Sequence, residues 1–375
     1  MIRKDTDRTY KIALSLCHGM TVSVVRTLAE RGVSHIDFFE WPMNRLLEVL
    51  GISTKGFLQT IDRQEALFKA RREEEFVIKH GIRTIFMLDD DYPVLLREIP
   101  DSPVILYILG HTPLDVSPSI AMVGTRRCSS YGLSFCDSFV NDFSAYYNNA
   151  LIVSGLAFGI DAASHSAALK YKLPTVAVLA HGLDTIYPSQ NRQLARDILA
   201  AGGALISEYP SATRPFPGNF LQRNRIVAGL SEMTIVVESE VKGGAMSTAN
   251  YAFSYNREVY ALPGRYTDKA SSGANMLVSR GKARIFTSVA DVMSEMGWPL
   301  PALNGARPPE KNLFPELEGD AETVFSFIRD KKLPVAIDEI HMATGLSVPV
   351  LMSTLTELEF EGIIVKLPGA RYEVQ

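Results

Sequence analysis

Several features that mark specialised protein classes are scarce or missing from this sequence. Its 375 residues include only three cysteines, Cys17, Cys128 and Cys136, and none of them forms a C-x-x-C pair. This spacing predicts neither a zinc site nor a disulfide framework. No apolar run approaches the roughly 20 residues that span a bilayer, and the N-terminus lacks the long apolar core of a secretory signal. We therefore expect a cytoplasmic protein that holds no metal and makes no membrane contact.

A strong charge of one sign is also missing. The net charge is −4, from 38 Lys and Arg against 42 Asp and Glu, which by itself argues against a protein that binds nucleic acid through bulk positive charge. The charge is unevenly distributed, however. From Leu313 to the C-terminus five basic residues stand against eleven acidic ones, a net charge of −6, so the rest of the chain carries +2. The excess acid therefore belongs to one end of the chain.

What is present is the composition of an ordinary globular protein. Hydrophobic residues make up 46% and charged residues 21%, which excludes disordered and collagen-like classes, and the length predicts two or three domains. Apolar residues at three- and four-residue spacing predict short helices joined by tight turns over 1–90. A proline-rich lead-in, 91–118, opens a middle domain, 91–298, and a proline-rich linker, 299–312, leads to a C-terminal domain, 313–375.

The middle domain alternates short apolar runs with helical patterns. The runs are typical of strands buried on both faces and span residues 120–124, 151–154, 175–179, 205–208, 234–238, 259–263 and 284–286. Helical patterns lie between them at 131–146, 161–172, 191–201 and 248–256. Repeated βα units of this spacing predict an α/β fold with a doubly wound, mostly parallel sheet.

The C-terminal domain has the outline of a winged helix-turn-helix. Helical patterns at 322–329, 337–344 and 348–361 precede two short strands at 363–366 and 371–374. In a DNA reader the third helix would enter the major groove. Here that helix carries Glu357, Glu359 and Glu361 and no lysine or arginine, so its charge opposes a phosphate backbone. We therefore expect it to contact protein or to cover another domain.

The candidate site lies in the loops that follow the strands, because ligands of open α/β sheets bind beyond the carboxyl ends of the strands. The loop after the first strand, which contains Gly124, Thr125 and Arg126, would by itself indicate only a capped helix start with surface arginines. Five such loops with glycines, helix starts and arginines predict a long anion-binding rim, and an aromatic side chain among arginines suits single-stranded nucleic acid. The candidate binding residues are Gly124, Thr125, Arg126, Ser154, Gly155, Asn219, Phe220, Arg223, Asn224, Arg225, Lys242, Gly243 and Gly244.

Signals for catalysis are weaker. His165 follows Asp161 by four residues, a spacing that is more often a hydrogen-bond arrangement at a helix start than an acid/base couple. His181 and Asp184 flank a glycine and are equally ambiguous. The loops contain no G-x-G-x-x-G, no G-x-S-x-G elbow and no Walker loop, so neither a dinucleotide oxidoreductase nor a known nucleophile is supported.

The ordered set of loops resembles the DNA-processing protein A (DprA/Smf) family. The motifs that carry the resemblance cover the whole middle domain: Val123-Gly124-Thr125-Arg126 with Tyr131-Gly132, Ser154-Gly155-Leu156-Ala157 with Gly159-Ile160-Asp161 and His165, Gly182-Leu183-Asp184 with Tyr187-Pro188, Ser207-Glu208-Tyr209, the run from Arg223 to Ser231, and Ala261-Leu262-Pro263-Gly264. The approach from Asp91-Tyr92-Pro93 to Leu106-Tyr107 is also similar to the family.

The resemblance implies an extended Rossmann-like domain, a helical N-terminal module of the SAM or helix-hairpin-helix kind and a C-terminal winged helix. It implies a protein that is not an enzyme and needs no cofactor. Such proteins bind incoming single-stranded DNA, form a homodimer through the Rossmann-like domain and help to load the RecA recombinase during natural transformation. The family's DNA contacts match the first loop, Phe220, the Arg223-Asn224-Arg225 triplet and the amides of Gly243 and Gly244.

Three departures from the family pattern bear on the strength of DNA binding. Phe158 and Pro217 stand where relatives often carry a basic residue, and Lys242-Gly243-Gly244-Ala245 replaces a more usual Ser-Gly-Ser type of run. Lys242 and Arg214 are the residues that could compensate.

The main alternative is an enzyme: a nucleotide-phosphate-binding hydrolase of the lysine-decarboxylase-like (phosphoribohydrolase) group, which uses a PGGxGTxxE loop. The nearest stretch here, 242–250, has no glutamate after its glycines. The absence of this catalytic glutamate favours a binding protein over a hydrolase. A regulator specific for double strands is opposed by the acidic third helix of the winged domain.

Overall fold

The computed structural model describes residues 5–299, 317, 319–331, 334–360, 363–367 and 370–374. The chain separates into two compact units, Met1–Ala302 and Leu303–Gln375. The predicted linker 299–312 lies outside the described residues except for Pro299, and so does Glu361.

The first unit begins with helices, as the apolar spacing predicts: α1 (Asp7–Leu16), α2 (Val22–Glu30), α3 (His35–Glu40), α4 (Met43–Leu50), α5 (Lys55–Gln59) and α6 (Arg63–Lys79). Side-chain oxygens of Thr6, Thr21, Ser34 and Asp62 accept hydrogen bonds from backbone amides three residues on, which sets where these helices begin. Helix α1 packs against α6.

A strand follows within the range for which only helices were predicted. Strand β1 (Arg83–Phe86) pairs antiparallel with β2 (Ile105–Gly110), and β2 pairs antiparallel with β6 (Ala204–Ser207). The prediction of helices alone up to residue 90 was therefore wrong at its end. A four-residue strand at the sheet edge is too short for periodicity to reveal, and its structure is decided by a partner far along the chain.

The sheet has nine strands in the order β1-β2-β6-β5-β4-β3-β7-β8-β9. The remaining strands are β3 (Ser119–Val123), β4 (Leu151–Ser154), β5 (Thr175–Val178), β7 (Met233–Val236), β8 (Glu258–Ala261) and β9 (Arg284–Ile285). From β6 to β9 every neighbouring pair is parallel. The predicted doubly wound, mostly parallel α/β sheet is confirmed, and the fold is Rossmann-like.

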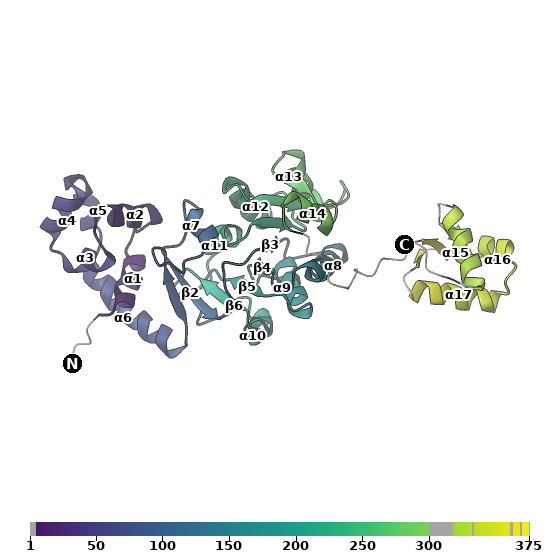
Figure 1. Ribbon diagram of the computed structural model, residues 1–375, viewed down its shortest axis with the longest axis horizontal. Coiled ribbons are helices and arrows are strands. Elements are labelled where there is room, and N and C mark those ends of the chain that lie inside the picture. Colours follow the sequence, from purple (N-terminus) through teal and green to yellow (C-terminus); the bar gives the residue numbers. More distant parts are fainter. Residues whose placement is uncertain are drawn as a thin grey trace. The chain divides into compact units, whose positions relative to one another are not determined.

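Helices cover both faces of this sheet (Figure 1). They are α7 (Val94–Glu98), α8 (Ser130–Tyr146), α9 (Ile160–Lys170), α10 (Arg192–Ala200), α11 (Pro217–Gly229), α12 (Ala245–Ser254), α13 (Ser272–Ser279) and α14 (Val289–Glu295). Successive residues of β3 point to opposite faces of the sheet, as in any pleated strand. Ile120 and Met122 pack in the core with α8 and α14, whereas Ala121 and Val123 pack in the core with α11 and α12.

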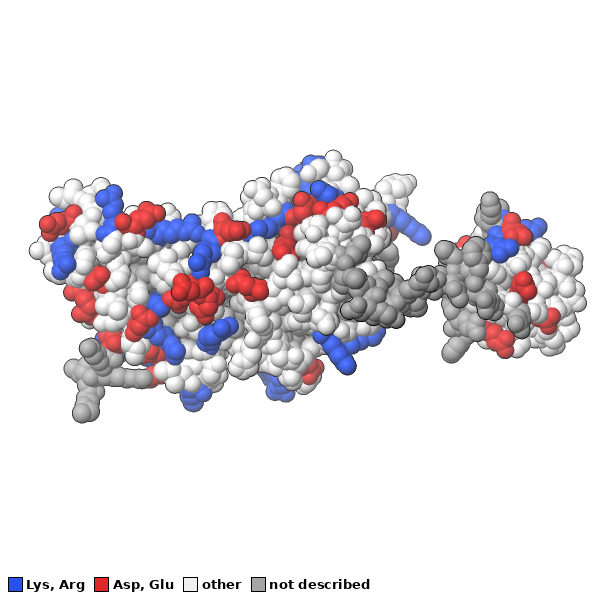
Figure 2. Space-filling view, viewed as in Figure 1, with Lys and Arg blue, Asp and Glu red and all other residues white. Residues whose placement is uncertain are grey.

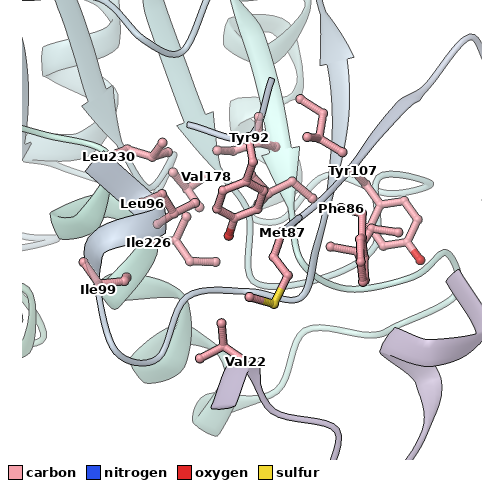
Figure 3. Packing of buried hydrophobic residues seen from close by; sticks show 14 of the residues in the cluster. Val22, Phe86, Met87, Tyr92, Leu96, Ile99, Tyr107, Val178, Ile226 and Leu230 are labelled. Carbon is pink, nitrogen blue, oxygen red and sulfur yellow. The ribbon is translucent and has the colours of Figure 1, made fainter. Parts of the chain in front are cut away.

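The lead-in 91–118 and the N-terminal helices share one core with the sheet. Figure 3 shows Tyr92, Leu96 and Ile99 packed beside Ile226 of α11 and beside Leu230, the residue that follows this helix. The Tyr92 hydroxyl donates to the Pro103 carbonyl at 2.7 Å. A Cβ at Gly229 would lie 2.8 Å from Ile99 and 2.9 Å from Leu96, so α11 approaches this segment as closely as a glycine permits. The lead-in therefore fixes the position of α11.

The second unit is a winged helix. It contains α15 (Asp320–Lys331), β10 (Val335–Ala336), α16 (Ile337–Thr344), α17 (Val348–Phe360), β11 (Ile364–Leu367) and β12 (Arg371–Val374), with the strands in the order β10-β12-β11. Phe325, Ile340, Leu355 and Tyr372 are buried in its own core. The predicted winged domain is confirmed, with β10 as an additional short strand. Glu357 and Glu359 of α17 are exposed.

Candidate nucleic-acid interface

A pocket of about 710 Å³ opens at the carboxyl ends of β3 and β7. These neighbouring strands connect onward in opposite directions, to β4 and to β8, which makes this the topological switch point of the sheet. The pocket contains most of the predicted binding residues. Those that line it are Gly124, Thr125, Arg126, Gly155, Phe220, Arg223, Asn224, Gly243 and Gly244.

The first loop is held in place by the loops on either side of it. The Thr125 amide donates to the Glu238 carbonyl at 2.7 Å, and the Ile160 amide donates to the Thr125 carbonyl at 3.2 Å. A Cβ at Gly124 would lie 2.4 Å from Ile160 and 2.9 Å from the Glu238 carbonyl oxygen, so only glycine fits between them. Arg126, the next residue but one, is exposed at the mouth of the pocket.

A cation and two aromatic rings form one side of the mouth. The Arg126 guanidinium lies 5.7 Å from the centroid of the Phe220 ring, and the Phe220 and Tyr187 centroids lie 5.7 Å apart with the rings tilted by 56°. Tyr187 is 47% exposed. A ring that is partly free beside a guanidinium can stack a base while the guanidinium holds the adjoining phosphate.

Tyr187 is a site residue that the reasoning from loops missed. His181 positions it: the Tyr187 amide donates to His181 Nε2 at 3.3 Å, and His181 Nδ1 lies 2.9 Å from the Gly182 carbonyl. Burial lowers the pKa of His181, which keeps the ring neutral with its proton on Nδ1. The sequence signal was present, because Tyr187-Pro188 was among the family-like motifs, but it pointed to no role.

Arg223 lines the pocket as a buried residue. Its side chain is 4% exposed, and Nη1 donates to the carbonyls of Gly155, at 2.6 Å, and Val178. A Cβ at Gly155 would lie 2.0 Å from Nη1, so this glycine makes room for the guanidinium. Burial lowers the pKa of Arg223, while the negative charge of Asp161 opposes that shift. Arg223 supplies a positive charge beneath the pocket and ties β4 to β5.

Four predicted residues do not line the pocket. Ser154 is buried and its hydroxyl donates to the Met122 carbonyl at 2.6 Å, so it is a sheet residue. Arg225 forms an ion pair with Glu208, at 2.5 Å, and lines a different hollow beside the N-terminal helices. Asn219 and Lys242 adjoin the pocket without lining it. The predicted place on the binding surface was therefore wrong for Ser154 and Arg225, whereas Asn219 and Lys242 stay candidates.

Helical geometry explains the division within α11. Residues at spacings of three, four and seven share one face of a helix. Phe220, Arg223, Asn224 and Val227 follow that spacing and all line the pocket. Arg225 lies well off that face, and the loop-by-loop prediction did not separate the two.

Asp161 and His165, the suspected acid/base couple, each make a structural hydrogen bond to another residue. His165 is fully buried, and its Nδ1 lies 2.7 Å from Thr175 Oγ1, whose own proton goes to the Ile152 carbonyl at 2.9 Å. His165 therefore donates, and burial lowers its pKa to about 3. Asp161 accepts from the Ala157 amide at 3.3 Å, which is the helix-start arrangement that the spacing favoured.

The described residues contain no group of three or more His, Cys, Asp and Glu side chains arranged to hold a metal ion. In the same residues no helix is both long enough and apolar enough to span a bilayer.

Fold and site together define a Rossmann-like protein with a cationic and aromatic pocket at the switch point, joined to a winged helix. A family model for DNA recombination-mediator protein A matches residues 83–297, and a model for the DprA winged helix domain matches residues 308–370. The chain belongs to the DNA recombination-mediator protein A (DprA/Smf) family.

Two curated relatives from this family are similar in sequence to the chain. Protein Smf of Synechocystis is 32% identical over 98% of this chain and 99% of its own length, and the DNA processing protein DprA of Streptococcus pneumoniae is 39% identical over 56% of this chain and 72% of its own. Among solved structures, DNA processing protein A of S. pneumoniae has a TM-score of 0.63 and 32% identity, covering 78% of this chain and 99% of that one.

A second solved structure, DNA processing protein A of Helicobacter pylori, has a TM-score of 0.51 and 31% identity over 57% of this chain and 95% of that one. Its description concerns the single-stranded DNA binding mode of that protein.

Proposed function

We propose that this chain binds single-stranded DNA in the switch-point pocket and, as a homodimer through its Rossmann-like domain, helps to load a RecA-type recombinase without catalysing a reaction. The observation that carries the proposal is the joint placement of Arg126, Phe220 and Tyr187 at the mouth of the pocket. Family membership, with its description as a recombination mediator, and the relative from H. pylori support the same reading.

The groups in and around the pocket suit a polymer better than a mononucleotide. Leu221, which lines the pocket next to Phe220, is 54% exposed, and Phe216, just outside the pocket at the start of α11, is 63% exposed. Apolar surface that extends past the pocket can stack or cover further bases, whereas a single nucleotide would leave it in water.

The carboxylates of the site also favour binding over hydrolysis. Among the described residues that line the pocket, Asp161 is the only acid, and it is buried and hydrogen-bonded to the Ala157 amide. Burial raises the pKa of Asp161, and the nearby Arg223 charge opposes that shift. An acid committed to a helix start cannot reach a substrate without leaving its partners.

The test is fluorescence anisotropy of labelled oligo-dT across a salt series, with duplex DNA and nucleoside monophosphate as competitors. We expect tight binding of the single strand that weakens with salt and resists both competitors. Displacement by the monophosphate alone, with no preference for longer strands, would support the phosphoribohydrolase alternative instead. Arg196→Ala, which removes an exposed arginine of α10 that does not line the pocket, is the control for loss of bulk charge.

Two further measurements address the partners. Sedimentation of the whole chain is expected to give a dimer, and a monomer at all concentrations would contradict the proposed assembly. The rate of RecA filament growth on single strands should rise when this protein is present. If that rate stays unchanged while single-strand binding is intact, the loading role is wrong and the binding role stands.

A further inference from the structure

One aromatic side chain on the sheet edge is almost wholly exposed and belongs to no part of the pocket. Tyr266 is 95% exposed, in the loop 262–271 that joins β8 to α13. Tyrosine usually buries most of its ring, and its use at binding surfaces follows from a large, stiff contact area with a polar tip. The adjoining side chains of Arg265 and Lys269 are also exposed.

The loop is held firmly at both ends. The Gly264 amide donates to Asn275 Oδ1 at 3.2 Å, and Asn275 Nδ2 donates back to the Gly264 carbonyl at 2.9 Å. Between these anchors the Asp268 amide donates to the Arg265 carbonyl at 3.0 Å, which closes a turn directly beside Tyr266. A ring presented by a clamped turn loses little conformational freedom when it is covered.

Helix α13, which follows this loop, begins against the wall of the pocket. The Gly273 amide donates to the Ser239 carbonyl at 2.7 Å, and a Cβ at Gly273 would lie 2.6 Å from the Glu240 carbonyl oxygen. Ser239 and Glu240 lead directly into Gly243 and Gly244, which line the pocket. In Figure 1 the adjoining helices α12 and α13 lie together beside the sheet. The loop that carries Tyr266 therefore follows β8, next to β7 in the sheet, and leads into a helix that contacts the wall of the pocket.

Charge around Tyr266 is balanced. The exposed Arg265 and Lys269 are matched by the exposed Asp268 and Glu240, and Figure 2 shows acidic and basic side chains mixed over the first unit. A surface with balanced charge gains little binding free energy from DNA phosphates, so we expect DNA to be held here by stacking of a base on the tyrosine ring.

We infer that the single strand bound in the pocket continues across the β8–α13 loop, where Tyr266 stacks one further base. The inference rests on the proposed function and deepens it: the site is longer than the pocket, and the extra length is held by an aromatic face. Affinity gained from that length is therefore nearly independent of salt.

The experiment compares oligo-dT of about 4 and about 16 nucleotides, the range of site sizes found for single-strand binding folds, with the wild-type protein and with Tyr266→Ala and Tyr266→Phe. We expect the alanine variant to bind the long strand about 5- to 150-fold more weakly, the effect of losing one stacked base. Binding of the short strand and the slope of affinity against salt should be unchanged, and phenylalanine should restore the long-strand affinity.

Phe68→Ala is the matched control, because Phe68 is 58% exposed on α6 and does not line the pocket. Equal affinity of Tyr266→Ala and wild type at both lengths would overturn the inference, and so would an equal loss at both lengths or a change in oligomeric state. If the wild-type protein binds neither strand, the proposed function itself fails. If it binds both equally well, the pocket binds DNA and only the extension is wrong.

Discussion

Replacement of Arg126 by alanine tests the pocket most directly. Arg126 is exposed at its mouth, and within the described residues no carboxylate forms a salt bridge with it. A charge-assisted contact with one phosphate contributes about 1.5–3 kcal/mol, so we expect affinity for oligo-dT at low salt to fall roughly 10- to 150-fold. The slope of log K against log salt should become shallower by about 0.7, the contribution of one phosphate on a single strand.

The contact between Arg126 and Phe220 adds a second, independent quantity. Their separation of 5.7 Å places the guanidinium within range of a cation–π interaction, which contributes about 0.5–1 kcal/mol at an exposed site. The double variant with Phe220→Ala should therefore lose less unfolding free energy than the sum of the single losses, by about that amount.

The assay is anisotropy at several salt concentrations, with Arg126→Lys as the companion variant. Lysine keeps the charge and hence the slope, but it loses bidentate geometry and part of the affinity. An Arg126→Ala protein with the wild-type slope would refute the reasoning, because the guanidinium would then face no phosphate.

The remaining predictions concern the ring at the mouth and the groups buried behind it. Phe220→Ala should cost about 1–3 kcal/mol of binding if the ring stacks a base, and unchanged affinity in the anisotropy assay would make it a packing residue. Arg223→Ala should lower the stability of the fold, because it leaves the Gly155 carbonyl and the buried Asp161 without their partner. We expect the unfolding free energy in denaturant to fall by about 3–5 kcal/mol. A variant as stable as wild type would contradict the structural role of Arg223. His165 has a pKa of about 3 in the folded protein, against an ordinary histidine value of 6.5. The contribution of the neutral, buried ring to folding stability is therefore complete above pH 6.5 and is lost as the pH falls toward 3, by about 3 kcal/mol at pH 4. The unfolding free energy of His165→Gln should therefore fall less steeply over that range than that of wild type.

Much of this architecture was accessible from the sequence because it depends on local pattern. The strands β3 to β8 are short, mostly buried apolar runs, whereas the predicted strand at 284–286 is the exposed edge strand β9. The structure places all of them within two residues of the predicted bounds. The same holds for α16 and for β12 of the winged domain, whose bounds match the predicted ones. Glycine-rich turns after the strands indicated the rim, because parallel strands bring their carboxyl ends to one edge.

The division of roles among neighbouring arginines was not accessible in this way. Arg223 and Arg225 are two residues apart and of one type, yet Arg223 lies beneath the pocket and Arg225 pairs with Glu208 on another side of α11. Which face each one occupies depends on how the lead-in packs α11 against the sheet, through Leu96, Ile99 and Gly229. Helical spacing separates the two arginines onto different faces, but it does not say which face meets the pocket.

The sequence by itself determined the order of βα units, the edge on which the loops gather and the outline of the winged helix, since apolar period and turn chemistry act over a few residues. Only the tertiary structure decided that β1 and β2 extend the sheet, that Tyr187 joins Phe220, and that Arg223 is buried while Arg126 is exposed. These outcomes depend on contacts between segments far apart in the chain. Burial and partner geometry set what a charged or aromatic side chain can do, and neither is a property of the residue alone.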